Sequence, residues 1–495
     1  MSRTLKITLA IFFWILSLVS PAQGILSIPE ERKLGEKILE QVEARFTLVH
    51  DPVIIGYVEK VGRRVLAHVK PRYFSYRFFV VKDRTLNAFA APGGLVFVHT
   101  GLLEVLDSED ELADVLAHEF AHVQCRHVAK RIEKLSRLNL ATAAVAIAGA
   151  FFGKGQTSSM LFSTSSALAT TLALRYSRAD EEEADRVGYE YILASGYDPR
   201  GLISILKKMQ RHRWLVSDNV PSYLLTHPGS SERLTYLESL IQNFPPQHLV
   251  AHDSFELRRV QMRVRVLSHD PYQLIARYER ELVDNPQDAL LHYGLGLALL
   301  KAKEYRRAIE ELKLTIKLLP QREELKADLG QAFLEAGRYQ EAIRILSPYT
   351  ARYPLDLSAR LNLAKALAEV GDFRKAIAIF EELSRRLPEN TEIYYRLGWA
   401  YASLKEDGRS HFYFGRYYKT IGDNATALYH YRQAARLLPP NDPLRKEVTR
   451  ILGKALRAPQ PPKEGHDTSG NRRLSSGLDH RFGPTNPSGP QRPSP

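Results

Sequence analysis

Two histidines spaced by four residues, His118 and His122, are the side chains of this chain best suited to chemistry. They stand in the segment His-Glu-Phe-Ala-His, and on a helix this spacing places both imidazoles on one face. Imidazole is a good ligand for Zn²⁺, and a catalytic zinc takes three protein ligands and leaves one position for water. Glu119, between the histidines, could take a proton from that water. The pattern predicts the metal centre of a zinc peptidase.

An acidic run about sixty residues further on offers the third ligand. It consists of Glu181, Glu182 and Glu183, followed by Ala184 and Asp185. Glu181 and Asp185 are separated by four residues, so on a helix they share a face. Glu181 would then bind the metal while Asp185 accepts a hydrogen bond from a ligating imidazole. The residues alone leave Glu182 and Glu183 as alternatives to Glu181.

The sequence marks the beginning of the helix that carries the two histidines. Ser108 and Glu111 have the spacing of a capping box, and the acidic residues around them suit a helix N-terminus. Apolar residues then recur at helical spacing, namely Leu112, Val115, Leu116, Phe120 and Val123. Cys125 follows as the only cysteine of the chain, which excludes an internal disulfide. We expect it to be a small buried side chain and not a ligand.

The region before this helix predicts another helix and a small β-sheet. Glu30–Phe46 has apolar residues at helical spacing, Tyr73–Val81 has the pattern of a strand, and a Pro-Gly-Gly turn precedes a strand at Leu95–Val98. We expect Leu95–Val98 to present an edge to which an extended substrate adds by main-chain hydrogen bonds. An ordinary core strand is the alternative. For His99 and His127 we expect polar contacts and no metal.

An internal repeat of 34 residues begins at residue 286. Proline recurs at 286, 320, 354 and 388, and the same period brings back the small residues Gly296, Gly330, Ala364 and Gly398 and the aromatic residues Tyr305, Tyr339 and Phe373. Small residues where two helices cross, with proline at the end of each unit, are typical of tetratricopeptide repeats. The period therefore predicts an α-helical solenoid. Phe255–Asn285 fits a degenerate first unit.

Both ends of the chain differ in composition from the rest. Arg3 and Lys6 precede an apolar run, which is typical of a signal peptide over residues 1–24, with an uncleaved N-terminal anchor as the alternative. Residues 457–495 are rich in Pro, Gly, Ser and Arg, and we expect them to be disordered.

The formal net charge of +13 suits anionic surfaces or solubility, and no nucleic-acid motif accompanies it. The apolar segment 138–174 predicts buried helices or a hairpin over the site, with membrane contact as the alternative.

Two motifs together resemble those of a known peptidase family. The first is His118–His122, and the second is Ser-Arg-x-x-Glu-x-x-Ala-Asp at Ser177–Asp185. Both match the zinc metallopeptidase family that contains the CAAX prenyl protease, HtpX and Oma-type enzymes. Asn87–Gly94 and Thr226–Pro228 are also similar to elements of that family.

The resemblance implies roles for individual residues. One zinc ion per chain would be held by His118, His122 and Glu181, with Glu119 as general base and later as the acid that protonates the leaving amine. The two remaining candidates for catalysis are His227 and Arg233, as donors to the oxyanion. By the same resemblance, His227 can instead cap the zinc and hold the enzyme latent.

The combined expectation is a mainly α fold with a small β-sheet, in which a zincin-like metallopeptidase domain (25–250) precedes a tetratricopeptide solenoid (251–456). We expect an exported, periplasmic zinc endopeptidase that cuts misfolded or stalled envelope proteins. Its repeats would recruit protein or peptide substrates or the outer-membrane assembly machinery, with peripheral membrane contact and no nucleic acid. The alternatives are a chaperone-like scaffold with a latent metal site and a membrane-tethered peptidase.

Overall fold

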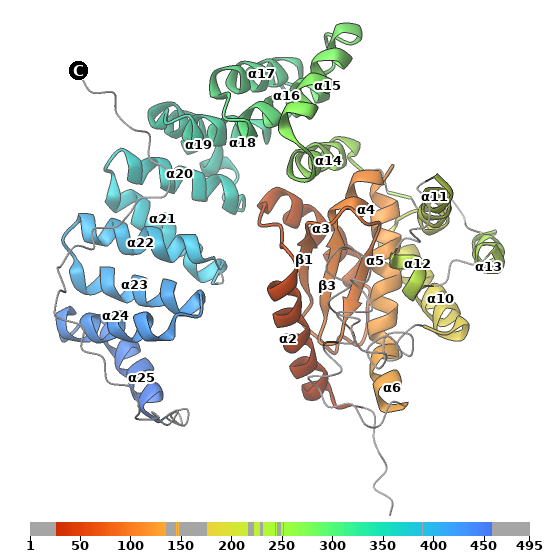
Figure 1. The fold of residues 1–495 in the computed structure, drawn as a ribbon, viewed down its shortest axis with the longest axis horizontal. Coiled ribbons are helices and arrows are strands. Elements are labelled where there is room, and N and C mark those ends of the chain that lie inside the picture. Colours follow the sequence, from red (N-terminus) through yellow and green to blue (C-terminus); the bar gives the residue numbers. More distant parts are fainter. Residues whose placement is uncertain are drawn as a thin grey trace, which may run out of the picture. The chain divides into compact units, whose positions relative to one another are not determined.

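A computed structural model gives the fold of the chain. It describes residues 26–134, 145, 147, 176–215, 222–227, 231–242, 244, 249–250, 252–388 and 390–457. The predicted signal segment at 1–24 and the predicted tail beyond residue 457 lie outside the described residues, as does the apolar segment 138–174 apart from residues 145 and 147. The described part is mostly helical with a three-stranded sheet, as the sequence predicts (Figure 1). It divides between Lys405 and Glu406 into two compact units.

The sheet of the first unit has the strand order β1-β3-β2. Its strands are β1 (Arg77–Val81), β2 (Ala88–Ala91) and β3 (Leu95–His99). Strand β3 pairs in parallel with β1 and in antiparallel fashion with β2. The expectation that Leu95–Val98 presents an edge is therefore wrong, because both of its sides are hydrogen bonded within the sheet. Strand β2 lies at the margin instead.

Side chains of the sheet alternate between two apolar layers, as the pleat of a strand requires. Phe89 and Phe97 point toward α2 (Ile28–Arg45), where they join one buried cluster. Val96 and Val98 point the other way, into a larger cluster with α3 (Pro52–Leu66) and α5 (Glu109–Gln124). The sheet is therefore covered by α2 on one face and by α5 on the other (Figure 1).

Helix α5 follows the short helix α4 (Thr100–Val105) and begins at the predicted cap. The Ser108 hydroxyl accepts a hydrogen bond from the Glu111 backbone N–H at 3.4 Å. The Glu111 carboxylate accepts one from the Asp107 backbone at 2.7 Å, so the reciprocal half of the predicted capping box is replaced by a contact one residue earlier. Lys208 also binds Glu111 at 2.6 Å. The start of α5 is thus held from two sides.

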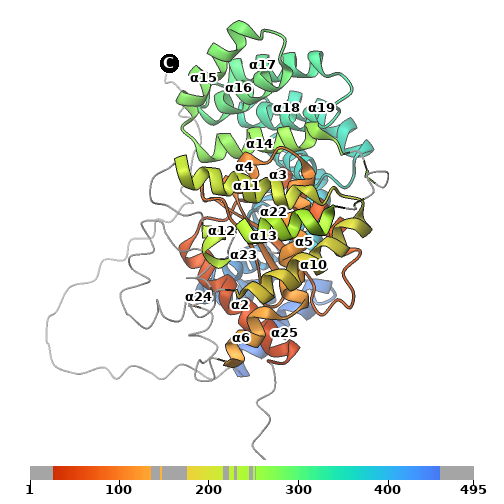
Figure 2. The same ribbon diagram turned by 90° about the vertical axis from the view of Figure 1, so that its right-hand side faces the viewer.

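Helix α10 (Arg178–Ser195) packs closely against α5 and brings the second motif to the first. Its N-terminus is closed by a capping box between Ser177 and Asp180. Gly188 permits the close approach, because a Cβ at this position would lie 3.2 Å from the backbone nitrogen of His118. Three further helices lie with α10 on the side of α5 away from the sheet (Figure 2), namely α11 (Arg200–Leu215), α12 (Ser222–Thr226) and α13 (Ser231–Ile241). Helix α6 (His127–Lys134) follows α5 after a short turn.

The helices after the peptidase motifs follow one another in pairs, of which the first is α14 (Ser254–Ser268) and α15 (Pro271–Asp284). Three further pairs and a single helix complete the first unit, namely α16 (Ala289–Lys301), α17 (Tyr305–Leu318), α18 (Leu325–Glu335), α19 (Tyr339–Arg352), α20 (Leu357–Glu369), α21 (Phe373–Arg386) and α22 (Thr391–Ser403). A Cβ on Gly330 would lie 2.4 Å from Leu346, so the recurring small residue does mark a helix crossing. Leu257, Val260 and Val264 of α14 belong to the same buried cluster as α3 and α5.

The second unit contains α23 (Asp407–Thr420), α24 (Asn424–Leu437) and α25 (Pro443–Arg457). Gly415 of α23 meets the ring of Tyr431 of α24, where a Cβ would lie 2.8 Å from the nearest ring atom. This crossing repeats the small-against-large contact of the first unit. Among the helices that the structure describes, none is long and apolar enough to cross a membrane.

Candidate metal centre and active site

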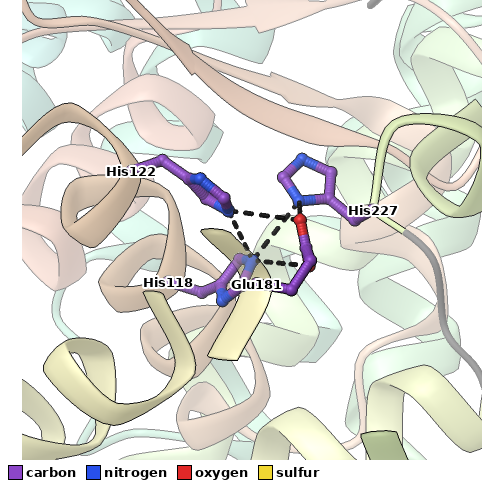
Figure 3. A group of neighbouring side chains, drawn as sticks. All are labelled: His118, His122, Glu181 and His227. Carbon is purple, nitrogen blue, oxygen red and sulfur yellow. Dashed lines mark hydrogen bonds and ion pairs between the residues drawn. The ribbon is translucent and has the colours of Figure 1, made fainter. Parts of the chain in front are cut away.

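Four side chains that can bind a metal converge between α5, α10 and the segment after α12 (Figure 3). His118 and His122 point from successive turns of α5, with their Nε2 atoms 3.0 Å apart. Glu181 of α10 approaches from the opposite side and lies 3.4 Å from His118 Nε2 and 3.5 Å from His122 Nε2. His227 completes the group, with its Nδ1 atom 3.0 Å from Glu181 Oε1. One atom from each residue lies within 4.8 Å of the others.

Glu181, and neither of its two neighbours, takes the place at this centre. Glu182 is exposed on the outer face of α10, and Glu183 lies on another side of the helix, where it contacts His127. Glu181 is 2% exposed and faces the two histidines. Burial raises the pKa of the Glu181 carboxyl, but His227 and Arg233 outweigh burial and hold that pKa well below its usual range. The carboxylate is therefore ionised, as a metal ligand must be.

Asp185 lies one turn further along α10 and contacts the other nitrogen of His118. Its Oδ1 atom is 2.9 Å from His118 Nδ1, which leaves His118 Nε2 directed at the centre. Burial and Arg233 lower the pKa of His118, but the hydrogen bonds with Asp185 and Glu181 outweigh them and raise it to about 9. The metal-free imidazole is thus protonated on both nitrogens at neutral pH, and a metal that binds one nitrogen must displace its proton.

Arg233 of α13 neutralises the two carboxylates. It donates to both oxygens of Asp185, from Nε at 2.9 Å and from Nη2 at 2.7 Å, and its Nη1 lies 2.5 Å from Glu181 Oε2. All three residues are buried. A buried carboxylate pair would be costly without a cation, and this forked geometry supplies one. Arg233 thus contacts the carboxylates of Glu181 and Asp185, and its Nη2 also lies 3.3 Å from His118 Nε2.

Glu119 lies beside the centre and is not one of the four converging residues. It is fully buried, and its Oε2 atom accepts a hydrogen bond from the backbone N–H of Ala90 in β2 at 3.2 Å. Its other oxygen, Oε1, lies 3.6 Å from His227 Nε2. Burial raises the pKa of the Glu119 carboxyl, in spite of the nearby imidazoles that lower it. A carboxyl with a raised pKa is suited to accept and return a proton near neutral pH.

The residues fit a bound zinc ion. Two imidazole nitrogens and a carboxylate oxygen are the donor set of many catalytic zinc sites. Within the described part of the chain, Glu119 Oε1 and His227 Nε2 are buried and have no hydrogen-bond partner. Buried polar atoms are seldom left in this state, which fits a centre whose polar groups are completed by a bound metal.

His227 contributes a fourth donor atom to the group formed by the two histidines and Glu181. It follows α12 directly, and its ring stacks on Tyr223 with centroids 4.4 Å apart. Its Nδ1 atom is 3.3 Å from His118 Nε2 as well as 3.0 Å from Glu181 Oε1. The side chain is 0% exposed, and the centre as a whole is closed to solvent.

Sequence reasoning assigned no function to three residues that touch this centre. Tyr176 stacks on His122 with centroids 3.9 Å apart, and Tyr223 stacks on His227. His127 contacts the outer nitrogen of His122 at 2.8 Å. The recurrence of a histidine five residues after His122 was a usable signal for the last contact. His99, in contrast, contacts Thr85 at 2.8 Å away from the centre, as expected.

Comparison with known proteins assigns this fold and these motifs to recognised groups. Residues 55–241 match peptidase family M48, and residues 299–368 and 333–394 match a tetratricopeptide repeat. The chain is 28% identical over 304 residues to the putative beta-barrel assembly-enhancing protease of Vibrio cholerae, covering 60% of this chain and 62% of that one. It is 27% identical to the beta-barrel assembly-enhancing protease of Escherichia coli K12, covering 59% of this chain and 60% of that one.

A third relative matches a shorter part of the chain. The mitochondrial metalloendopeptidase OMA1 of Schizosaccharomyces pombe is 33% identical over 218 residues, which cover 43% of this chain and 61% of that one. The chain spans about three fifths of the length of the relatives it matches.

Proposed function

We propose that this chain, which carries a domain of peptidase family M48 followed by tetratricopeptide repeats, is a zinc-dependent endopeptidase that cuts protein substrates. One observation carries the proposal. Nitrogens of two histidines and an oxygen of one glutamate converge within 4.8 Å, and a second carboxylate, that of Glu119, lies buried beside them. This is a ligand set together with a base, which is what metal-assisted peptide hydrolysis requires.

His118, His122 and Glu181 would hold the zinc ion, which when bound would polarise the scissile carbonyl and acidify a water molecule. Glu119 accepts the proton of that water at its Oε1 atom and passes it to the nitrogen of the leaving amine. The Ala90 N–H fixes the second oxygen of Glu119, at 3.2 Å, so the free oxygen keeps its direction. Arg233 holds Glu181 and Asp185 in place and offsets their charge.

Strand β2 is the candidate for substrate alignment. The Asn87 carbonyl accepts a hydrogen bond from His99 of β3 at 3.0 Å, so on an alternating strand Ala88 and Ala90 direct their backbone groups away from β3. Ala90 is also the residue that contacts Glu119. An extended peptide that adds at this margin would therefore pass next to the base.

The closed centre supports a latent enzyme. His227 fills the open side of the ligand group, where a fourth protein ligand would displace the catalytic water. Substrate access then requires His227 and the end of α12 to move. This arrangement keeps an exported peptidase inactive until a substrate or partner engages it.

The repeats are proposed to recruit the substrate or a partner. Stacked tetratricopeptide units form a surface suited to extended peptides and helices. The similarity to two proteins named beta-barrel assembly-enhancing protease supports envelope proteins as substrates, a periplasmic location and contact with outer-membrane assembly. A chaperone-like scaffold with a permanently shut metal site is the second candidate, and the burial of His227 is the observation that favours it.

The decisive experiment combines metal analysis with a casein digestion assay on the full chain. We expect one zinc per chain, loss of digestion with a chelator and recovery with added zinc. Glu119→Gln should retain zinc and lose about 10²- to 10⁴-fold in rate, because it removes the base but no ligand. His118→Ala, His122→Ala and Glu181→Ala should lose zinc as well.

Exposed His68 provides the control, since His68→Ala should change neither zinc content nor rate. Full digestion by Glu119→Gln, or equal zinc loss in Glu119→Gln and the ligand variants, would refute the assigned roles. A wild-type chain that holds zinc and never digests protein, even after His227→Ala, would favour the scaffold.

A further inference from the structure

His127 is a buried histidine on the far side of His122 from the metal centre. It is the first residue of α6 and is 0% exposed. A turn at Cys125 and Arg126 separates α5 from α6, and Arg126 adopts a left-handed φ of 55° that residues with a side chain rarely use. The Arg126 guanidinium binds the buried carboxylate of Glu31 in α2, with Nε 2.7 Å from Oε1. This contact holds the turn that carries His127 back toward His122.

A continuous series of contacts leads outward from the ligand His122. Its Nδ1 atom lies 2.8 Å from Nδ1 of His127, and Nε2 of His127 lies 3.0 Å from Oε2 of Glu183. The two ring centroids are 4.9 Å apart and the ring planes are inclined at 72°.

These contacts fix where the protons must be. Nε2 of His122 faces Glu181 and His118, so as a ligand it has no proton there and carries one on Nδ1. That N–H donates to His127 Nδ1, which must therefore be the unprotonated nitrogen of its ring. The proton of His127 is then on Nε2, where it donates to the Glu183 carboxylate. One tautomer of each ring satisfies every contact.

We propose that His127 and Glu183 are positioning residues that fix the tautomer and the ring orientation of the metal ligand His122. The inference rests on the proposed zinc site and extends it to residues with no assigned role. Asp185 fixes the tautomer and orientation of His118 in the same way by direct contact, because its Oδ1 atom lies 2.9 Å from His118 Nδ1. The Nδ1 atom of His122 instead meets the imidazole of His127, which links it to the carboxylate of Glu183 on α10. Glu181 and Glu183 thus act on opposite sides of one ligand.

A second metal site at Cys125, His127 and Glu183 is the competing assignment, because their donor atoms also lie within 4.8 Å of one another. A metal at His127 Nε2 would take the lone pair there and force the proton onto Nδ1. Two N–H groups, of His122 and His127, would then face each other at 2.8 Å. A second metal and the zinc-binding tautomer of His122 therefore exclude one another, which makes the two assignments separable.

The test measures zinc affinity of the full chain by competition with a chelating indicator, together with zinc stoichiometry. Loss of such an outer partner of a ligating histidine typically weakens metal binding about 10- to 100-fold, and we expect a loss in this range for His127→Phe. His127→Gln should recover part of it, because its amide can accept from His122 and donate to Glu183. Glu183→Leu should weaken binding several-fold. Glu182→Gln, at the exposed neighbour on the same helix, is the matched control and should bind as the wild type does.

Unfolding of the metal-free variants separates positioning from a general loss of structure. The proposal requires weaker zinc binding with an unchanged apo unfolding midpoint, and partial rescue by His127→Gln. Wild-type affinity in both His127→Phe and Glu183→Leu would overturn it, and so would a second zinc whose binding depends on Cys125. If His127→Phe fails to fold, Glu183→Leu decides, since Glu183 is only half-buried. A chain with this affinity pattern that cuts no protein would refute the peptidase and leave the positioning role standing.

Discussion

Arg263 of α14 lies 2.8 Å from Asp51, the residue that caps α3, and so joins the first repeat helix to the helix that supports α5. Arg263 also reaches Asp328 of α18 at 2.8 Å, and Arg259 binds the same carboxylate at 2.9 Å. These side chains are largely buried, and Asp328 is the carboxylate that both arginines share. The repeats and the peptidase domain therefore share one charged junction.

Asp328→Asn should destabilise this junction. It removes the charge of the carboxylate that Arg259 and Arg263 share, so that Asp51 remains as the one carboxylate paired with these two buried guanidinium groups. Breaking a buried ion pair typically lowers the free energy of unfolding by about 3 to 5 kcal/mol. The free energy of unfolding from urea titration is the measurement. Glu323→Gln is the control, because the pair of Glu323 with Lys326 is partly exposed and such pairs add little to stability. Equal effects of the two substitutions would show that the junction adds no stability.

His227→Ala should activate the enzyme. The substitution removes the side chain that lies 3.0 Å from Glu181 and that we propose as the cap of the metal centre. We expect casein digestion or self-cleavage to rise roughly tenfold, the factor that a closed state favoured by about 1.4 kcal/mol would conceal. Zinc content should not fall, and His68→Ala should leave the rate unchanged. An inactive variant with intact zinc would instead make His227 a donor to the transition state.

The sequence predicted the core of the site because its parts follow local periodicity. The spacing of His118 and His122 and the apolar pattern around them defined a helix, and the spacing of Glu181 and Asp185 placed both on one face of another. The residues alone left three adjacent glutamates open, and the resemblance to the peptidase family favoured Glu181. In the structure, the packing of α10 around Gly188 decides which side faces the histidines. Local pattern carries no information on that rotation.

Other features depended on contacts that no local pattern encodes. The strand at Leu95–Val98 was found, but its central place in the sheet follows from long-range pairing with β1. His127 returns to His122 only because Arg126 adopts a left-handed turn held by Glu31. A helical extrapolation through Cys125 would have carried His127 away from its partner.

Acid should weaken the fold through His99. Burial lowers the pKa of this imidazole from 6.5 to about 4, against the opposing effect of Asp83. Between these pH values the unfolded chain binds more protons than the folded one, so stability is complete above pH 6.5 and falls as the pH drops toward 4. The shift corresponds to at most about 3 kcal/mol. Unfolding free energies at pH 7, 5.5 and 4.5 measure the slope.

His99→Gln should flatten this dependence, because the amide has no proton to gain in that range. His68→Gln serves as the matched control at an exposed histidine and should keep the wild-type slope. An unchanged slope in His99→Gln would assign the acid sensitivity to other groups.

Recruitment by the repeats is best tested by substitution, since removing the chain after residue 250 would also remove Leu257, Val260 and Val264 from the core of the peptidase domain. Tyr395 and Trp399 are one turn apart on α22 and are 39% and 36% exposed. Exposed aromatic residues of this kind commonly dominate binding energy at protein interfaces. The double variant Tyr395→Ser and Trp399→Ser should therefore raise KM for casein roughly tenfold, the effect of losing about 1.4 kcal/mol of binding. The kcat/KM for a short peptide should stay the same, because the peptide reaches the zinc centre without the repeats.

Tyr73→Ser, at a tyrosine 38% exposed in the peptidase domain, is the control and should leave the casein KM unchanged. If the double variant, with an unaltered unfolding midpoint, cuts both substrates as the wild type does, this face of the repeats does not select the substrate.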